Sequence, residues 1–267
     1  LEKPEVMVLD MLANFDWSRP IYFVQPNLLS NLGLNDYLQY DGFAYRLVPI
    51  KTPVESAAEM GRIDTDYLYH NLMEVYRYGN VADPDVYVDN FSRYNLNSIQ
   101  ARGAFARLAE ALIKEGDSQR AIEVLDRGVE VLPFDKLPHG YQSFSYIDAY
   151  YAAGATEKGD ALAREFANYL TQYLYHYFTF PDRLQPLIYD QMMDQYQYLN
   201  HLIYSVLLPQ GRMDLVNECG KSLDIVDLFF GIVYDENGKA EDTGIVVDDR
   251  TREEFLESID GHFIIEN

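Results

Sequence analysis

Residues 102–135 read RGAFARLAEALIKEGDSQRAIEVLDRGVEVLPFD, a pattern that predicts two helices joined by a tight turn. Four apolar side chains recur at helical spacing in the first half: Phe105, Leu108, Ala109 and Leu112. Gly116 and Asp117 then interrupt the pattern, because glycine ends helices readily and aspartate caps the next one. Small and large side chains share one face in the second half: Ala121, Leu125 and Gly128. Pro133 is expected to end the second helix.

This order of large and small residues is typical of a tetratricopeptide repeat, whose period is about 34 residues. Such hairpins bury their apolar faces by stacking on neighbouring hairpins, so further copies are expected. Two looser helix pairs follow: 142–153 with 157–178, and 186–208 with 213–229. The fold class that we predict is therefore mainly α, with tetratricopeptide-like helical hairpins (an α-α superhelix) over residues 64–230.

Residues 1–63 are predicted to form a small α/β cap. An amphipathic helix is expected at 5–15, strands at 20–24 and 44–50, and a short helix within 28–40. Asp64 is a plausible cap for a helix over 67–78, which begins the helical region, and the polar residues 80–95 are expected to form a connection.

Residues 231–267 are predicted to form a C-terminal extension. The apolar runs 232–234 and 244–247 suggest a short β-hairpin, and the residues between them favour a turn. A capping-box pattern at 251–254 favours a short helix, with a last strand at 263–265.

The composition limits the classes of partner. The 267 residues include 43 acidic and 21 basic side chains, which gives a net charge of -22. A surface this acidic repels phosphate groups, so we expect no nucleic-acid partner. Cys219 is the single cysteine, which excludes an internal disulfide and favours a buried structural thiol. No apolar run is long enough for a membrane helix. Because the chain begins at Leu1, we expect it to be a piece of a longer protein.

No motif in the sequence predicts catalysis, and we expect no catalytic residue, no metal and no cofactor. Phosphate-loop, dinucleotide-binding and nucleophile-elbow patterns are missing. No two histidines stand three or four residues apart, so no helix presents a metal-binding pair. The five are His70, His139, His176, His201 and His262.

The strongest candidate for binding is the concave side of the hairpins, which the first helix of each pair lines. Five residues are predicted to lie there: Arg107, Glu110, Lys114, Tyr146 and Tyr150. A groove of this kind would hold a protein, a peptide or a glycan acceptor, since tyrosine offers a flat ring and a hydroxyl. The favoured alternative is that the cations pair with nearby acids and that the tyrosines pack between helices.

Two N-terminal stretches have distinctive sequences: WSRPIYF at 17–23 and YLQYDGFAYRLVP at 37–49. Together with the helix pair at 105–133, they resemble the C-terminal part of a bacterial multi-pass membrane protein family related to protein O-mannosyltransferases, which look like GT-C-type glycosyltransferases. Six residues carry the motifs: Trp17, Arg19, Tyr22, Asp41, Gly42 and Arg46. We interpret this set as structural. Trp17 and Tyr22 are expected to be core anchors, and Arg19 and Arg46 to pair with Asp16 or Asp41.

The resemblance implies that the catalytic acid lies in a membrane-embedded part outside this chain, so no catalytic residue is carried over. It also implies an extracytoplasmic (periplasmic) location, with membrane contact only through that missing part. The first hypothesis is thus a non-catalytic, soluble scaffold domain of a glycosyltransferase-like membrane protein. The alternatives are a free-standing interaction module, or an enzyme with its site between the α/β cap and the helices.

Overall fold

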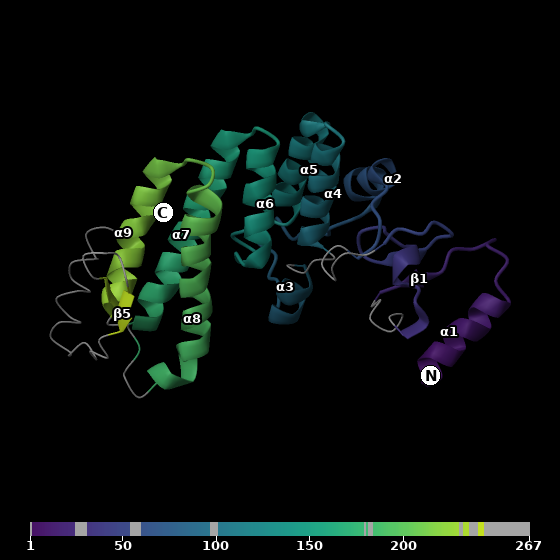
Figure 1. The fold of residues 1–267 in the computed structure, drawn as a ribbon, viewed down its shortest axis with the longest axis horizontal. Helices are drawn as coiled ribbons and strands as arrows, with labels where there is room; N and C mark the ends of the chain where they lie inside the picture. Colours follow the sequence, from purple (N-terminus) through teal and green to yellow (C-terminus); the bar gives the residue numbers. More distant parts are fainter. Residues whose placement is uncertain are drawn as a thin grey trace. The chain divides into compact units, whose positions relative to one another are not determined.

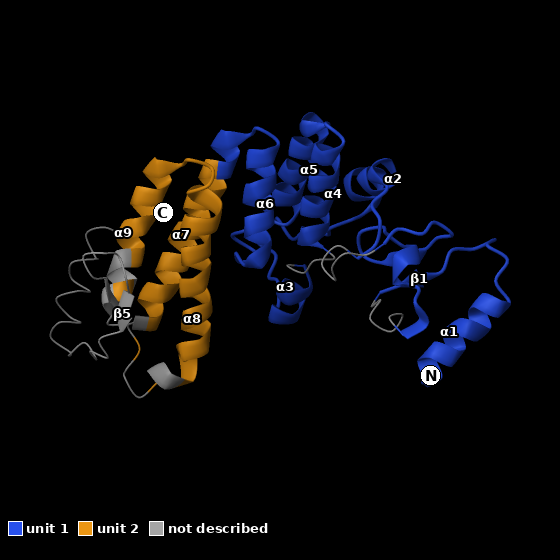
Figure 2. Ribbon diagram, in the orientation of Figure 1, with its two compact units in different colours: residues 1–159 blue, residues 160–267 orange. Residues whose placement is uncertain are grey.

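The computed structural model describes residues 2–24, 31–53, 60–96, 101–178, 180, 184–229, 232–234 and 240–242. Its described part is mainly helical, with a small antiparallel sheet near the N-terminus, and its helices pack as hairpins, as predicted (Figure 1). The chain divides into two compact units, residues 1–159 and residues 160–267, which Figure 2 colours separately. The division at 63 and 230 expected from the sequence stays a prediction.

The first unit begins with helix α1 (Lys3–Ala13) and a three-stranded sheet in the order β1-β3-β2. The strands are β1 (Tyr22–Phe23), β2 (Leu38–Tyr40) and β3 (Tyr45–Leu47), all paired antiparallel. The prediction of a short helix within 28–40 is wrong at residues 38–40. These residues form strand β2, which follows a 3-10 turn, η2 (Asn35–Tyr37). All three residues of β2 are buried, so they lack the alternation that identifies a strand. A parallel bridge between Gln39 and Arg62 extends the sheet.

Helix α2 (Thr65–His70) begins where the sequence predicts, because the Asp64 carboxylate accepts the backbone N–H of Tyr67 at 3.1 Å. It continues as a π-helix, η4 (Asn71–Val75), and ends three residues before the predicted position. Part of the predicted connection at 80–95 is wrong, since residues 90–96 form helix α3 (Asn90–Leu96). This helix has no buried residue, so its sequence has no periodic pattern of apolar side chains that would predict a helix.

The first hairpin consists of α4 (Arg102–Lys114) and α5 (Ser118–Val131) and confirms the central prediction. Gly116 adopts a φ of 86° at the turn, and the Asp117 carboxylate accepts the backbone N–H of Arg120 at 3.1 Å. The apolar residues of the motif are all buried. Helix α6 (Tyr141–Ala152) packs against both helices of this hairpin. Helix α7 (Thr156–Phe178) follows, and Gly159 at its start faces the Tyr151 ring so closely that a Cβ would lie 2.7 Å from it.

In the second unit, the rest of α7 is followed by α8 (Gln185–His201), the π-helix η5 (Leu202–Leu207) and α9 (Met213–Phe229). Their core includes Phe166, Leu170 and Leu202. Strands β4 (Ile232–Tyr234) and β5 (Ala240–Asp242) form the predicted hairpin, although the second strand precedes the expected run. The predictions for 244–247, 251–259 and 263–265 lie outside the described residues.

Candidate ligand-binding pocket

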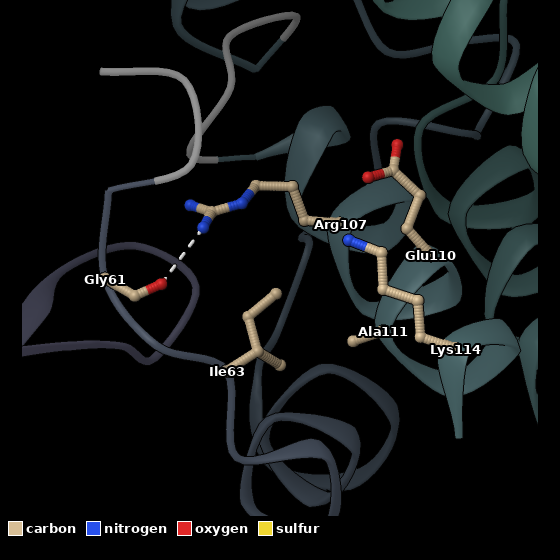
Figure 3. A pocket seen from close by; sticks show the side chains of 6 residues that line it. All are labelled: Gly61, Ile63, Arg107, Glu110, Ala111 and Lys114. Atoms are coloured by element: carbon tan, nitrogen blue, oxygen red, sulfur yellow. Dashed lines mark hydrogen bonds between the residues drawn. The ribbon is translucent and has the colours of Figure 1, made fainter. Parts of the chain in front are cut away.

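A pocket of about 220 Å³ lies between α4 and the segment that precedes α2 (Figure 3). Four residues of α4 line it, namely Arg107, Glu110, Ala111 and Lys114, and the preceding segment contributes Gly61 and Ile63. The structure therefore brings together three of the five predicted binding residues. Their spacing of three and four residues places them on one side of the helix.

Arg107 has a structural role that the sequence did not predict. Its Nη2 atom donates hydrogen bonds to the carbonyl oxygens of Met60 and Gly61, each at 3.1 Å, and Figure 3 shows the bond to Gly61. The guanidinium carbon lies 4.2 Å from the centre of the buried Tyr40 ring, a cation–π contact. Arg107 thus fastens the end of the α/β cap to the first hairpin while one side of it lines the pocket.

Lys114 differs from Arg107 in its surroundings. Its ammonium projects toward the middle of the pocket in Figure 3, and no carboxylate of the described residues lies within ion-pair distance of it. Glu110, one turn earlier, is exposed at the rim. The predicted alternative of an ion pair with Glu115 does not occur, since the Glu115 carboxylate instead accepts the hydroxyl of Thr65 at 2.9 Å.

The two predicted tyrosines do not line a binding face, and this part of the prediction is wrong. Tyr146 is fully buried and its hydroxyl donates to the carbonyl oxygen of Arg102 at 3.1 Å. Tyr150 is also buried, and its hydroxyl donates to the Asp126 carboxylate at 3.0 Å. Burial raises the pKa of both hydroxyl groups. Packing between helices, the favoured alternative, accounts for both, because α6 packs on the first hairpin with its tyrosine-bearing side inward.

Four of the six motif residues meet around Asp41, a buried carboxylate next to the sheet. Arg46 confirms the predicted ion pair, with its Nε 3.1 Å from Asp41 Oδ2. Gln39 donates to the other carboxylate oxygen at 2.9 Å. Burial nevertheless raises the pKa of Asp41, because desolvation outweighs the Gln39 hydrogen bond and the Arg46 charge. Tyr22 lies near enough to this carboxylate to lower its pKa slightly, against the larger effect of burial.

Gly42, the fourth of these residues, occupies a position where the backbone conformation requires glycine. Its φ is 103°, in a region that favours glycine, and an added Cβ would lie 2.9 Å from the Tyr76 ring. The Tyr76 hydroxyl donates to the carbonyl oxygen of Asp41. The Asp41-Gly42 pair therefore holds the β2–β3 turn against η4, which is a structural role.

The expectation that Trp17 and Tyr22 are core anchors is wrong. The exposed fractions of these residues are 53% for Trp17 and 44% for Tyr22. Trp17 lies in a turn before the edge strand β1, where its ring packs on Phe15 at 4.7 Å between centroids. Within the described residues, Arg19 has no ion pair with Asp16 or Asp41, since Asp16 instead accepts the backbone N–H of Ser18.

The sequence missed Gly61 and Ile63 as pocket residues. Nothing in their local pattern marks a site, because they belong to the connection between the sheet and α2. The one local signal is Gly61 itself, whose φ of 83° and close approach to the backbone of Tyr40 require glycine.

The same described part of the chain offers few other groups suited to chemistry. No group of three or more His, Cys, Asp or Glu side chains there is arranged to hold a metal ion. Cys219 is buried, as predicted, and burial raises the pKa of its thiol to about 11, so it stays protonated near neutral pH. None of the helices in these residues is both long and apolar enough to cross a bilayer.

Replacing Arg107 by methionine is expected to loosen the α/β cap from the first hairpin. The change removes two charge-assisted hydrogen bonds and a cation–π contact, which together should cost about 2 kcal/mol. Hydrogen exchange should detect it at the backbone amides of Tyr40 and Arg62, which bond across the bridge at the cap's end. The matched control is Lys114→Met on the same helix face, which should leave exchange of these amides unchanged. Equal protection in the Arg107 variant would contradict the anchoring role.

The comparisons with known proteins concern mainly the cap. Residues 1–67 match the family described as TMEM260-associated domain 2, a match compatible with a domain of a membrane protein. The matched segment contains the Asp41 cluster and the two pocket residues that precede α2. No curated protein and no solved structure matches the chain.

Proposed function

We propose that this chain is the non-catalytic, ligand-binding scaffold of a glycosyltransferase-like membrane protein. In this proposal it holds an acceptor polypeptide or a protein partner on the extracytoplasmic (periplasmic) side of the membrane. The match of residues 1–67 supports the membrane-protein context. The link to glycosyl transfer rests on the resemblance of the stretches at 17–23 and 37–49 to protein O-mannosyltransferase relatives.

The observation that carries the binding role is the position of the pocket. Its walls come from both the segment that matches the family and helix α4 of the first hairpin. Arg107 joins these two parts through the carbonyl groups of Met60 and Gly61, so the walls are held at a set separation. A pocket with rigid walls loses little conformational entropy on binding, which favours ligand capture over a purely packing role.

The ligand class follows from the size and openness of this pocket. A volume of about 220 Å³ admits one side chain or one chain end, and helical hairpins commonly present such pockets to extended polypeptides. The acidic composition argues against nucleic acid and anionic lipid as partners. A segment of acceptor polypeptide anchored by one residue is the partner that these features support best.

Photo-crosslinking in the full-length gene product tests this proposal. A small diazirine amino acid at Ala111, inside the pocket, should capture a polypeptide in cells. The same probe at Gln119, an exposed position on α5, serves as the matched control and should capture nothing at comparable yield. Absence of polypeptide adducts at Ala111, or equal capture at the two positions, would reject the binding role.

A labelling experiment tests the location. In a Cys219→Ser background, a cysteine introduced at Gln119 should react with a membrane-impermeant maleimide in intact spheroplasts. Labelling only after lysis would place the region on the cytoplasmic side and overturn that part of the proposal. The full-length gene must also encode a multi-span hydrophobic region before Leu1. If it does not, the free-standing interaction module becomes the better explanation.

A further inference from the structure

We propose that the pocket beside α4 recognises a single carboxylate group of its polypeptide ligand, an inference that rests on the proposed binding function. The group is either an Asp or Glu side chain or the C-terminal carboxylate. The ammonium of Lys114 supplies the direct contact, the guanidinium of Arg107 adds positive charge beside it, and Ile63 with Ala111 supplies the apolar wall.

The charges of the pocket differ from those of the neighbouring helix. On α5, Arg120 pairs with Asp66 at 3.1 Å and Arg127 pairs with Glu130 at 2.7 Å. On the pocket side of α4, Arg107 donates to carbonyl oxygens, and Lys114 has no carboxylate within 4 Å in the described chain. Within the described residues neither cation has a carboxylate at ion-pair distance, so two positive charges against the one negative charge of Glu110 leave this pocket locally positive in a chain of net charge -22.

The donors suit a carboxylate better than a phosphate. Two carbonyl oxygens already engage Nη2 of Arg107, so the guanidinium cannot offer the two-pronged grip that phosphate sites typically use. Its Nη1 atom is buried, so it contributes charge to the pocket without direct contact with a ligand oxygen. Glu110 at the rim adds a negative charge that repels a dianion more strongly than a monoanion. One accessible ammonium beside a second, shielded positive charge therefore suits the single negative charge of a carboxylate.

The apolar wall and the volume of the pocket limit which part of the ligand can enter together with the carboxylate. Ile63 and Ala111 lie on the same side of the pocket in Figure 3, below the side chains of Arg107 and Lys114, where they would contact a methylene stem. A space of about 220 Å³ corresponds to roughly seven water molecules at about 30 Å³ each. This accommodates a carboxylate with its first carbons and excludes a folded partner from entering.

Calorimetric titration of the whole 267-residue chain tests the inference with four probes. Three are N-acetylated hexapeptides of one sequence: one with a central Glu and an amidated end, one with Gln there and a free carboxyl end, and one with Gln and an amidated end. The fourth is inorganic phosphate. At least one carboxylate peptide should bind about tenfold more tightly than the neutral peptide. The carboxylate peptide that binds more tightly identifies whether the pocket takes a side-chain or a C-terminal carboxylate.

Lys114→Met should weaken binding of the preferred carboxylate peptide about three- to fivefold, the range expected for loss of one exposed ion pair. It should leave the neutral peptide unaffected. Lys221→Met, which removes an exposed lysine of α9, is the matched control and should change neither. Lys114→Glu should weaken the carboxylate peptide further, by more than about tenfold, because it replaces attraction with repulsion.

Three outcomes would overturn the inference. These are equal binding of the carboxylate and neutral peptides, equal effects of the Lys114 and Lys221 variants, and tighter binding of phosphate than of any carboxylate peptide. Each leaves the proposed function open to its own test, because the diazirine at Ala111 captures a polypeptide whatever group enters the pocket. Loss of capture there would reject the function itself.

Discussion

Gly128→Ala is expected to lower the free energy of unfolding of the first unit by about 3 kcal/mol, although alanine is the better helix former. Gly128 lies in the interior of α5, where α5 meets α4 and α6. An added Cβ would lie 2.2 Å from the hydroxyl oxygen of Tyr146 and 2.9 Å from the ring of Phe105. Neither neighbour can yield cheaply, since both are fully buried.

Urea denaturation followed by far-UV circular dichroism measures this loss. Gly220→Ala is the matched control, because Gly220 is also inside a helix but an added Cβ there meets no atom within 4 Å. That variant should be unchanged or more stable by up to about 1 kcal/mol, from helix propensity alone.

A double variant isolates the physical cause. Tyr146→Phe removes the atom closest to the new methyl group, so Gly128→Ala should cost at least about 1 kcal/mol less in that background than in the parent chain. Additive effects of the two changes would show that the contact with the Tyr146 hydroxyl is not what forbids a side chain at position 128.

Arg102→Met is the second substitution with a large expected effect, and it should lower the free energy of unfolding by about 4 kcal/mol. Arg102 is only 1% exposed and is the largest of the fully buried side chains in the described structure. Its guanidinium donates to the carbonyl oxygens of Leu132 at 2.8 Å, Pro133 at 3.1 Å and Pro138 at 3.3 Å. It also lies 4.0 Å from the centre of the Phe134 ring.

Methionine fills a similar volume but removes three hydrogen bonds at the end of α5 and in the connection to α6. The carbonyl of the buried Leu132 loses its guanidinium donor, whereas that of Pro133 keeps the backbone N–H of Leu137 at 3.0 Å. Leaving buried acceptors unsatisfied costs more than the bonds themselves contribute. Thermal and urea unfolding should both report the loss. Arg127→Met, which removes a half-exposed ion-pair partner on α5, should change stability by less than about 1 kcal/mol.

Arg102→Lys refines this prediction, because it keeps the charge but not the planar fork. It should recover less than half of the lost stability, since one compact ammonium cannot replace the planar fork that donates to three carbonyl groups. Full recovery would mean that charge alone, and not the directional hydrogen bonds, stabilises the end of this hairpin.

The first hairpin could be predicted residue by residue because its signals are local. The spacing of Phe105 and Leu108 shows one helix face, and the Gly116-Asp117 pair carries both the turn and the cap in two adjacent residues. Strand β2 could not be predicted, because burial on both sides removes the alternation on which a strand prediction depends. Trp17 was misjudged because aromatic size predicts burial only on average.

Three of the six residues that line the candidate pocket could be predicted from the sequence. The spacing of Arg107, Glu110 and Lys114 places them on one helix face, which periodicity alone establishes. The opposite wall, Gly61 and Ile63, comes from a connection more than 40 residues earlier, and no period relates it to α4.

The sequence by itself therefore determined the helical hairpins, their turns and the side of α4 that carries the cations, since each depends on neighbours within a few residues. Only the tertiary structure decided which charged and aromatic side chains turn inward. Arg102 is buried because carbonyl groups some 30 residues away need donors, and Arg107 is held because the cap presents two more. Among the described residues, Lys114 meets no such acceptor, and that difference, decided by packing, makes its side of the helix the candidate site.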